Sequence, residues 1–428
     1  MANPVLRGGL RLLSAFASSG LAERYGVEDQ AKDLVTRAAL LGVDLLQRGG
    51  SKARPSGSSD GRRQRFDLTP TESQELLRTT LRRFAAEVLR PAASEADETL
   101  RPPEDVLSMA AEIGLTDFAI PESFGGAAEE RSPLTTALLA EELAHGDMAL
   151  ALALLSPMSV AHLVQDHGTE TQKRELLGRL CGEDQVLASA ALLEARPLFD
   201  PRKLKTKAKA QGKGYRLSGE KTLVPLGELS RFFLVSAELA GVGPRLFVVE
   251  RDQPGLDLSP EPAMGLRGAN LCRMKLRDVE LSGAALLGTP DAHDHQRVID
   301  LARVAWGALA VGQCRAVLDY VKPYCNDRIA FGEPISNRQS VAFLIADMRI
   351  EIDGMRLLTW RAAARAERGK SFTREAHLLA VQASQKAMKI GTDGVQLLGG
   401  AGFICEHPVE LWYRHLRAVG VMEGALSA

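Results

Sequence analysis

The sequence predicts a mainly α-helical protein with a central β domain: an N-terminal helical domain, a small antiparallel β-barrel-like domain and a C-terminal four-helix bundle. Three long segments, residues 296–321, 338–367 and 374–398, have apolar residues at helical spacing and are joined by short turns, which is typical of an antiparallel bundle. Residues 185–282 instead contain short β-prone runs bounded by glycine and proline. A chain of 428 residues is long enough for several such domains.

Changes in composition along the chain predict five segments. They are a helical N-terminal extension (1–48), a flexible linker (49–66), an N-terminal helical domain (67–184), a middle β domain (185–288) and a C-terminal helical bundle (289–428). The linker is predicted because its residues are mostly glycine, serine and arginine, which offer little apolar surface to bury.

Local signals predict how individual elements begin and end. Thr69 can cap the first helix of the folded body, with Pro70 in its first turn and Glu72 completing a capping box. The uncharged run 148–165 is shorter than the about 20 strongly apolar residues of a membrane span, so we expect a buried helix, broken near Pro157.

One strand of the middle domain can be predicted in detail. Apolar residues alternate with charged ones from Cys272 to Leu276, which is the pattern of a half-buried strand. The apolar positions shift phase after Asp278, which predicts a bulge or the end of the strand.

Composition excludes several functional classes. The 53 basic and 54 acidic residues give a net charge of −1, so no nucleic-acid partner is expected. The five cysteines lie far apart without a CxxC pair, which argues against a zinc ribbon or a disulfide framework and fits a reducing compartment, the cytoplasm. His293 and His295 have no third ligand nearby in the sequence, so we expect no metal site.

Several strings occur in a recognisable order after the β domain. Residues 328–335 read RIAFGEPI and are followed by Gln339 and by Ala-Asp-Met at 346–348; residues 395–403 read VQLLGGAGF. Together they resemble the acyl-CoA dehydrogenase family, and the likeness runs from about residue 68 to residue 424. The resemblance implies a flavoprotein oxidoreductase of lipid metabolism that oxidises an acyl thioester with FAD. It also implies a homodimer or homotetramer, or a hetero-oligomer with a paralogue; it does not identify the electron-transfer partner.

The resemblance also implies roles for individual residues. Glu423, followed by Gly424, matches the family's catalytic base, which removes the α proton of the thioester while FAD accepts the β hydride. Without the resemblance, a solvated carboxylate would be the simpler interpretation of Glu423. Asp300, Arg303 and Arg267 match substrate-binding positions.

The family's flavin site is shared between two subunits, and this chain keeps one half of it. Arg328 resembles the arginine that binds the pyrophosphate of the neighbouring subunit's cofactor. The other residues of this half that match cofactor-binding positions are Phe331, Gln339, Gln396, Gly399 and Gly400.

The other half, which lies in the middle domain, departs from the family pattern. The string T-E-P-G-A-G-S-D falls on residues 193–200, where only Glu194 and Asp200 are kept and Arg196 replaces a glycine. Leu223 replaces the aromatic ring beside the flavin, and Pro225 replaces a hydroxyl donor. Each neutral hydrogen bond lost removes about 0.5–1.5 kcal/mol, so several losses weaken cofactor binding.

Three functions therefore remain open from the sequence. The first is an FAD-dependent dehydrogenase of an acyl-CoA or carrier-bound acyl group, which we favour. The second is a flavin-poor subunit that lends its retained half-site to an active paralogue. The third is a redox-neutral enzyme that uses Glu423 for proton transfer on the same fold.

Overall fold

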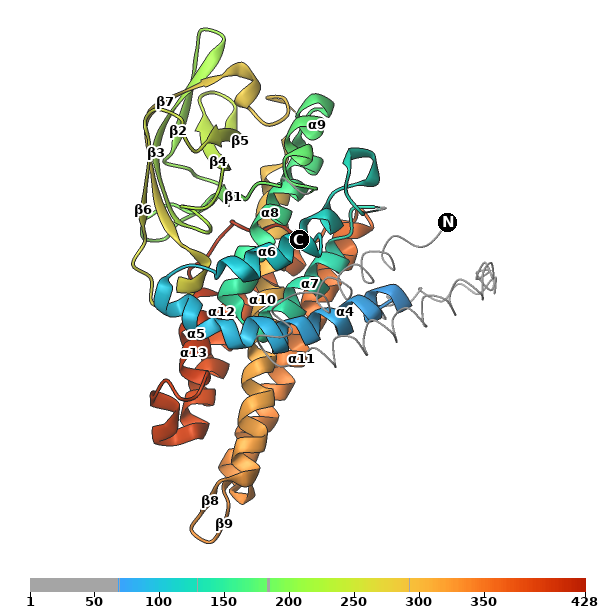
Figure 1. Ribbon diagram of the computed structural model, residues 1–428, viewed down its shortest axis with the longest axis vertical. Helices are drawn as coiled ribbons and strands as arrows, with labels where there is room; N and C mark the ends of the chain where they lie inside the picture. Colours follow the sequence, from blue (N-terminus) through green and yellow to red (C-terminus); the bar gives the residue numbers. More distant parts are fainter. Residues whose placement is uncertain (1–67, 69, 129, 183–184, 292) are drawn as a thin grey trace, which may run out of the picture.

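The computed structural model describes residues 68, 70–128, 130–182, 185–291 and 293–428. The predicted extension 1–48 and linker 49–66 lie outside the described residues, as does Thr69. Helices form one end and the centre of the molecule, and a curled β-sheet lies at the other end (Figure 1). This arrangement confirms the predicted fold class, with helical domains before and after a central β domain.

The N-terminal helical domain precedes the sheet. Its helices are α4 (Glu72–Phe84), α5 (Arg90–Thr99), α6 (Glu104–Glu112), α7 (Pro133–Gly146), α8 (Met148–His167) and α9 (Glu170–Gly178). A single π-helical turn, Ala85–Leu89, joins α4 to α5.

The predicted capping box of the first helix is wrong by two residues. Thr71 caps α4: its hydroxyl accepts from the Gln74 backbone N–H at 3.2 Å, and the Gln74 side chain accepts from the Thr71 N–H at 2.9 Å. The sequence contains two overlapping boxes, and packing favours the second, because the Gln74 amide also donates to Thr135 of α7 at 3.1 Å.

The predicted break in the uncharged helix is also wrong. Helix α8 continues through Pro157. The Ser156 and Ser159 hydroxyls donate to carbonyls four residues earlier, at 2.7 and 2.9 Å, and the surrounding core holds the helix together. Among the described residues, α8 is the one helix that is apolar and long enough to cross a membrane. However, 94% of its most apolar stretch is buried inside the fold, as in the core helix of a folded domain.

The middle domain is a seven-stranded sheet. Its strands are β1 (Ala188–Ala191), β2 (Lys207–Gln211), β3 (Gly214–Val224), β4 (Phe232–Leu239), β5 (Gly243–Glu250), β6 (Leu256–Pro260) and β7 (Cys272–Ser282). The order is β1-β4-β2-β3-β7-β6, with β5 on β4. Strand β4 runs parallel to β1 and β2, so the sheet is mixed, whereas the sequence suggested an antiparallel one.

The predicted bulge is confirmed on β7. The pairing register between β3 and β7 shifts between Leu217 and Gly219, and Asp278 has a left-handed backbone with φ +51°. The bulge lets β7 keep its apolar side chains on the core face on both sides of the shift.

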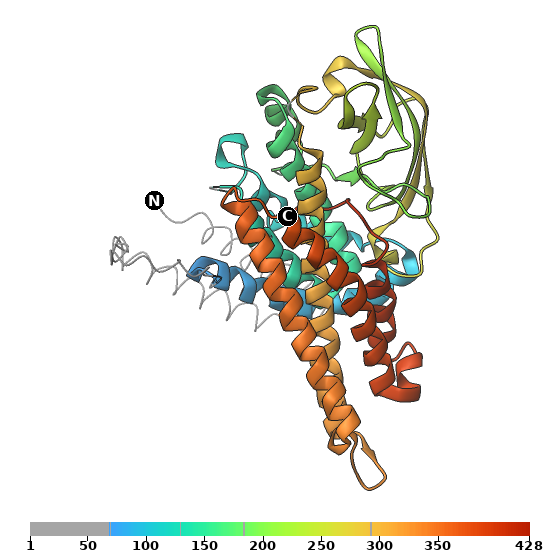
Figure 2. The ribbon, with the colours of Figure 1, turned by 180° about the vertical axis from the view of Figure 1, so that it is seen from behind.

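The C-terminal bundle consists of α10 (His295–Asp327), α11 (Gln339–Glu367), α12 (Thr373–Leu398) and α13 (Val409–Ala418). Helices α10 and α11 extend away from the sheet and meet in a hairpin of β8 (Ile329–Ala330) and β9 (Glu333–Pro334) (Figure 1). After α13 the chain returns toward the β domain (Figure 2). This returning segment carries Glu423.

Candidate active site

A cavity of about 600 Å³ lies between the middle domain and the bundle. Its walls come from five parts of the chain: the loop after β1, the end of β3, one face of α10, one face of α12, and the segment after α13. The residues that line it include Leu193, Glu194, Arg196, Leu198, Phe199, Thr222, Leu223, Arg303, Trp306, His377, Ser384, Met422 and Glu423. The rebuilt middle-domain loop thus faces the predicted base across one cavity.

Glu423 is held in this cavity by one cation. Arg303 of α10 donates from Nε to a Glu423 carboxylate oxygen at 2.9 Å, and the two side chains are only 14% and 21% exposed. Burial raises the pKa of Glu423 above its ordinary value, while Arg303 opposes that rise. A partly desolvated carboxylate with a raised pKa is a stronger base than a solvated one and is suited to accept a proton.

The other two predicted substrate-binding residues do not reach this cavity. Asp300 is buried, accepting hydrogen bonds from Gln296 at 2.8 Å and from the Thr373 hydroxyl at 2.6 Å. Arg267 lies beside a separate cavity of about 630 Å³ and pairs with Asp97 at 3.4 Å. Of the three residues, the structure brings only Arg303 to Glu423.

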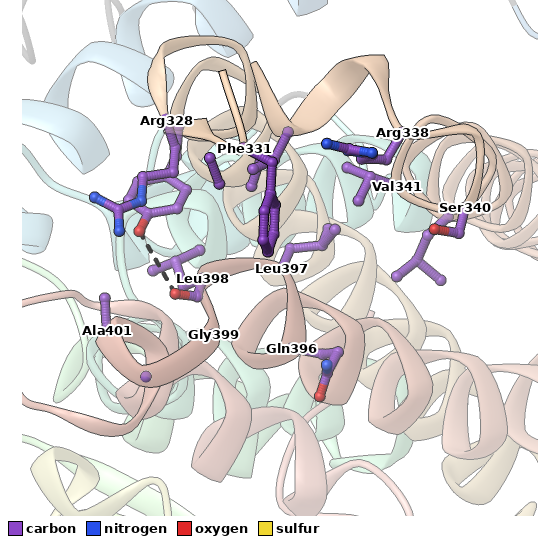
Figure 3. A pocket seen from close by; sticks show the side chains of 15 residues that line it. Arg328, Phe331, Arg338, Ser340, Val341, Gln396, Leu397, Leu398, Gly399 and Ala401 are labelled. Carbon is purple, nitrogen blue, oxygen red and sulfur yellow. Dashed lines mark hydrogen bonds between the residues drawn. The ribbon is translucent and has the colours of Figure 1, made fainter. Parts of the chain in front are cut away.

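A third cavity, of about 1080 Å³, lies at the far end of the bundle, beside the α10–α11 hairpin and the turn after α12 (Figure 3). Arg328, Phe331, Gln396, Gly399 and Gly400 all line it, as expected from a shared half-site. Of the predicted set, Gln339 alone is not in its lining.

The groups in this third cavity are available to a ligand. Arg328 is exposed and forms no ion pair with any residue that the structure describes. A Cβ at Gly399 or Gly400 would meet nothing within 4 Å, so their backbone borders open space. Figure 3 shows Phe331 reaching from the hairpin toward the turn after α12. We call this cavity, with Arg328, Gln396, Gly399 and Gly400, the hairpin site.

The two family-like residues kept in the middle-domain loop serve different purposes. Glu194 is buried and accepts from the backbone N–H groups of Lys205 and Thr206 and from the ammonium of Lys221 at 3.1 Å. Lys221 is itself fully buried, and burial lowers its pKa to about 8. Asp200 pairs with Arg202 near the surface. Glu194 therefore anchors the loop to β3.

The new side chains of this loop are tied together. Arg196 donates to the carbonyls of Asp200 and Lys203, and its guanidinium lies 5.2 Å from the ring centroid of Phe199. Leu198 is 97% exposed despite lining the cavity mouth. Sequence reasoning missed Trp306 and His377 as cavity residues, because helical periodicity alone gave no reason to separate them from core or surface positions.

Comparison with known proteins supports the expected relationship. The described domains match three family models: the N-terminal domain of acyl-CoA dehydrogenase at residues 71–184, the middle domain at 189–279 and the C-terminal domain at 294–426. The chain belongs to the acyl-CoA dehydrogenase family. Members of the family are oxidoreductases of lipid metabolism.

Individual relatives cover nearly the same region. A probable acyl-CoA dehydrogenase of Mycobacterium tuberculosis is 32% identical over 375 residues, covering 84% of this chain and 94% of that protein. The structure of butyryl-CoA dehydrogenase from Megasphaera elsdenii superposes with a TM-score of 0.77 at 27% identity, covering 84% of this chain and 96% of the other. A prolyl acyl carrier protein oxidase superposes with a TM-score of 0.75 at 26% identity, covering 82% and 95%.

Acyl-CoA dehydrogenases bind FAD, and the residues present fit that cofactor. The hairpin site offers an exposed guanidinium and open glycine backbone, the kind of surface that a pyrophosphate requires. The cavity at Glu423 has volume for a ring system and places a carboxylate on its wall, although its middle-domain wall is largely apolar. The hairpin site thus fits the phosphate end of FAD through polar groups, whereas the cavity at Glu423 fits the ring system mainly through its volume and shape.

Proposed function

We propose that this acyl-CoA dehydrogenase-like chain catalyses the α,β-dehydrogenation of an acyl thioester with Glu423 as the base. One observation carries the proposal: the Glu423 carboxylate lies in a cavity facing the middle domain, paired with Arg303 alone among the described residues, and its pKa is raised. A solvated surface carboxylate, the alternative interpretation from the sequence, does not have this environment.

The chain's own residues would act as follows. The Glu423 carboxylate takes the α proton, and the electron pair left on the α carbon forms the new double bond as a hydride leaves the β carbon. Arg303 stabilises the ionised form of the carboxylate before the reaction. The apolar side chains of Leu193, Leu223 and Met422 exclude water from the reacting carbons. FAD, when bound, supplies the acceptor for the β hydride.

Two subunits would hold each cofactor. Thr222, Leu223 and the loop 193–199 of one chain would enclose its flavin end, and the hairpin site of a second chain would hold its phosphate end. The two cavities share no lining residue, which supports a site completed by a neighbouring subunit. A homodimer or homotetramer is the simplest assembly.

The hairpin site also favours a second candidate, pairing with a paralogue. Its cofactor-facing groups match the family pattern, whereas the middle-domain wall has lost hydroxyls, so this chain could complete a partner's site more effectively than its own. Purification from its natural host distinguishes the candidates: a homo-oligomer that is active alone contradicts the paralogue arrangement.

The substrate is an acyl-CoA or an acyl group on a carrier, and we place the reaction in the cytoplasm. The carrier-bound option is supported by the similarity to the prolyl acyl carrier protein oxidase. The reducing equivalents pass to an electron acceptor whose identity the site does not specify.

An anaerobic titration tests the function. Purified protein carrying FAD is expected to lose its visible flavin absorbance when a series of acyl-CoA thioesters is added, because the β hydride reduces the flavin. Glu423→Gln should retain the flavin and the fold but show no bleaching. Equal bleaching by wild type and Glu423→Gln removes Glu423 as the base, and protein that binds no added FAD removes the redox assignment.

A further inference from the structure

The backbone that carries the base makes a tight turn against the middle domain. Gly424 has a left-handed backbone with φ +75°, and a Cβ built there would lie 2.5 Å from the Cβ of Leu192. Leu192 follows strand β1, so the turn is wedged against the sheet. This contact supports the turn on one side only, and the position of the Glu423 carboxylate depends on what holds the other side.

Helix α10 supplies the other side. The Trp306 indole N–H donates to the Gly424 carbonyl oxygen at 2.7 Å, and Trp306 is buried, with only 4% of its surface exposed. Arg303 and Trp306 are three residues apart and so lie on one face of the helix. The first holds the carboxylate of Glu423 and the second holds the adjacent backbone.

We propose that Trp306 is a positioning residue for Glu423, a role that rests on the proposed function of Glu423 as base. Its indole acts through the Gly424 carbonyl and fixes where the carboxylate stands relative to Arg303 and the cavity. A buried carbonyl oxygen without a hydrogen-bond donor is destabilising. Loss of the indole donor should therefore shift the turn to a position where the Gly424 carbonyl finds another donor. Misplacement of a catalytic group by about 1 Å can cost on the order of 100-fold in rate.

A merely structural tryptophan and a positioning tryptophan predict different kinetics. Loss of a cavity wall changes the thioester concentration needed for half-maximal rate, or the melting temperature. Loss of positioning lowers the maximal rate and alters the pH profile. Since Arg303 opposes the raised pKa of Glu423, a carboxylate that drifts from Arg303 has a still higher pKa, so the acid limb of the profile moves to higher pH.

The test uses proton exchange rather than oxidation. Acetyl-CoA has α protons but no β carbon, so the base can exchange its α protons with D2O while no hydride can leave. Exchange by the FAD-loaded protein is followed by NMR as a function of acetyl-CoA concentration and pH for wild type, Glu423→Gln, Trp306→Phe and a matched control, Trp360→Phe. Trp360 also donates from its indole, to Glu141 at 3.1 Å, but it lies outside the cavity.

Trp306→Phe should exchange roughly 10- to 100-fold more slowly at saturating acetyl-CoA, with its acid limb at higher pH and its half-saturating concentration unchanged. Trp360→Phe should exchange like wild type. Wild-type rate and pH profile in Trp306→Phe, with exchange abolished in Glu423→Gln, overturns the positioning role and leaves the base intact.

Failure of the proposed function has a different signature. Exchange by Glu423→Gln at the wild-type rate, or no exchange by wild type, removes Glu423 as base and the inference with it. If Trp306→Phe does not fold, Trp306→His replaces it, because its smaller ring cannot maintain the same contact with Gly424. Slower exchange with a displaced acid limb then supports the proposal, and wild-type behaviour contradicts it.

Discussion

The hairpin site and the cavity at Glu423 serve one proposed cofactor but are built from opposite kinds of residues. The hairpin site presents an exposed guanidinium, a side-chain amide and open glycine backbone. The cavity at Glu423 is lined on its middle-domain side mostly by apolar side chains, beside Glu194, Arg196 and Thr222, and the Arg303–Glu423 pair comes from the bundle. Under the proposed function, binding of the phosphate end and chemistry at the ring end rest on separate residues.

The largest expected effect on this comparison comes from removing the polar contact of the hairpin site. Arg328→Ala deletes a charge-assisted hydrogen bond, which is worth about 1.5–3 kcal/mol, so FAD affinity should fall roughly 10- to 100-fold. Isothermal titration calorimetry, with FAD added to the FAD-free protein, measures this affinity. Arg277→Ala, which removes an exposed cation of β7 paired with Asp257, is the control and should bind FAD normally. Equal affinity in wild type and Arg328→Ala would show that the hairpin site does not hold the cofactor.

The second effect separates the chemistry from the binding. Arg303→Gln removes the cation that lowers the pKa of Glu423, leaving burial to raise it. A base must be ionised to work, so turnover should fail at a higher pH on the acid side than in wild type, while FAD affinity stays the same. The pH dependence of the acyl-CoA-driven bleaching rate measures this shift. An unchanged acid limb means that Arg303 does not set the ionisation of the base.

A smaller effect sharpens the comparison from the apolar side. Phe199→Ser places a hydroxyl where the family pattern has one and removes the ring beneath Arg196. One neutral hydrogen bond is worth about 0.5–1.5 kcal/mol, so FAD should bind about two- to tenfold more tightly. Leu100→Ser, at an exposed position outside this cavity, is the matched control. Weaker FAD binding by Phe199→Ser would mean that the apolar wall of the cavity stabilises bound FAD by packing against it.

The smallest effect concerns a histidine cluster behind the same loop. His293 lies between His167 and His295, at ring-centroid distances of 4.7 and 5.6 Å, and His295 bonds to the Pro201 carbonyl at 2.8 Å. Burial lowers the pKa of all three, that of His293 to about 3.

Lowered histidine pKa values give a definite sign to the pH dependence of stability. The unfolded chain binds protons near pH 6.5 and the folded chain only at lower pH, so stability should fall as pH drops below about 6.5. His145 and His162, whose pKa values burial also lowers, and the carboxylates contribute their own dependence, so the comparison is with His293→Gln, whose melting temperature should fall less between pH 7 and pH 5. Equal falls in both proteins contradict a role for the cluster.

The sequence predicted those parts of the molecule that depend on local pattern. The helices of the bundle and the β7 bulge follow from periodicity, and the clustering of Arg328, Phe331, Gln396 and the glycines follows from family resemblance. Predictions failed where packing chooses between local options. The cap moved to Thr71 because of a contact with α7, and α8 stayed continuous because the core surrounds it.

Contacts between segments far apart in the sequence were the hardest features to predict from the sequence. The Trp306–Gly424 hydrogen bond joins residues 118 positions apart, and no local pattern indicates it. Asp300 was expected among the substrate-binding residues, but its carboxylate is occupied by Gln296 and Thr373 at the α10–α12 contact. Its substrate role stays a prediction without support from its position.

Complementation between two inactive variants tests most directly the claim that the base of one chain works with the hairpin site of another. Arg328→Ala keeps its base but lends a poor hairpin site, and Glu423→Gln lends a good hairpin site but lacks the base. When the two differently tagged variants are co-expressed and the mixed oligomer is isolated, one kind of site combines an intact Glu423 with an intact Arg328. At an FAD concentration that loads wild type but not Arg328→Ala, the account predicts that acyl-CoA oxidation reappears in the mixed oligomer and is absent from each variant alone. A mixed oligomer as inactive as its parents contradicts it.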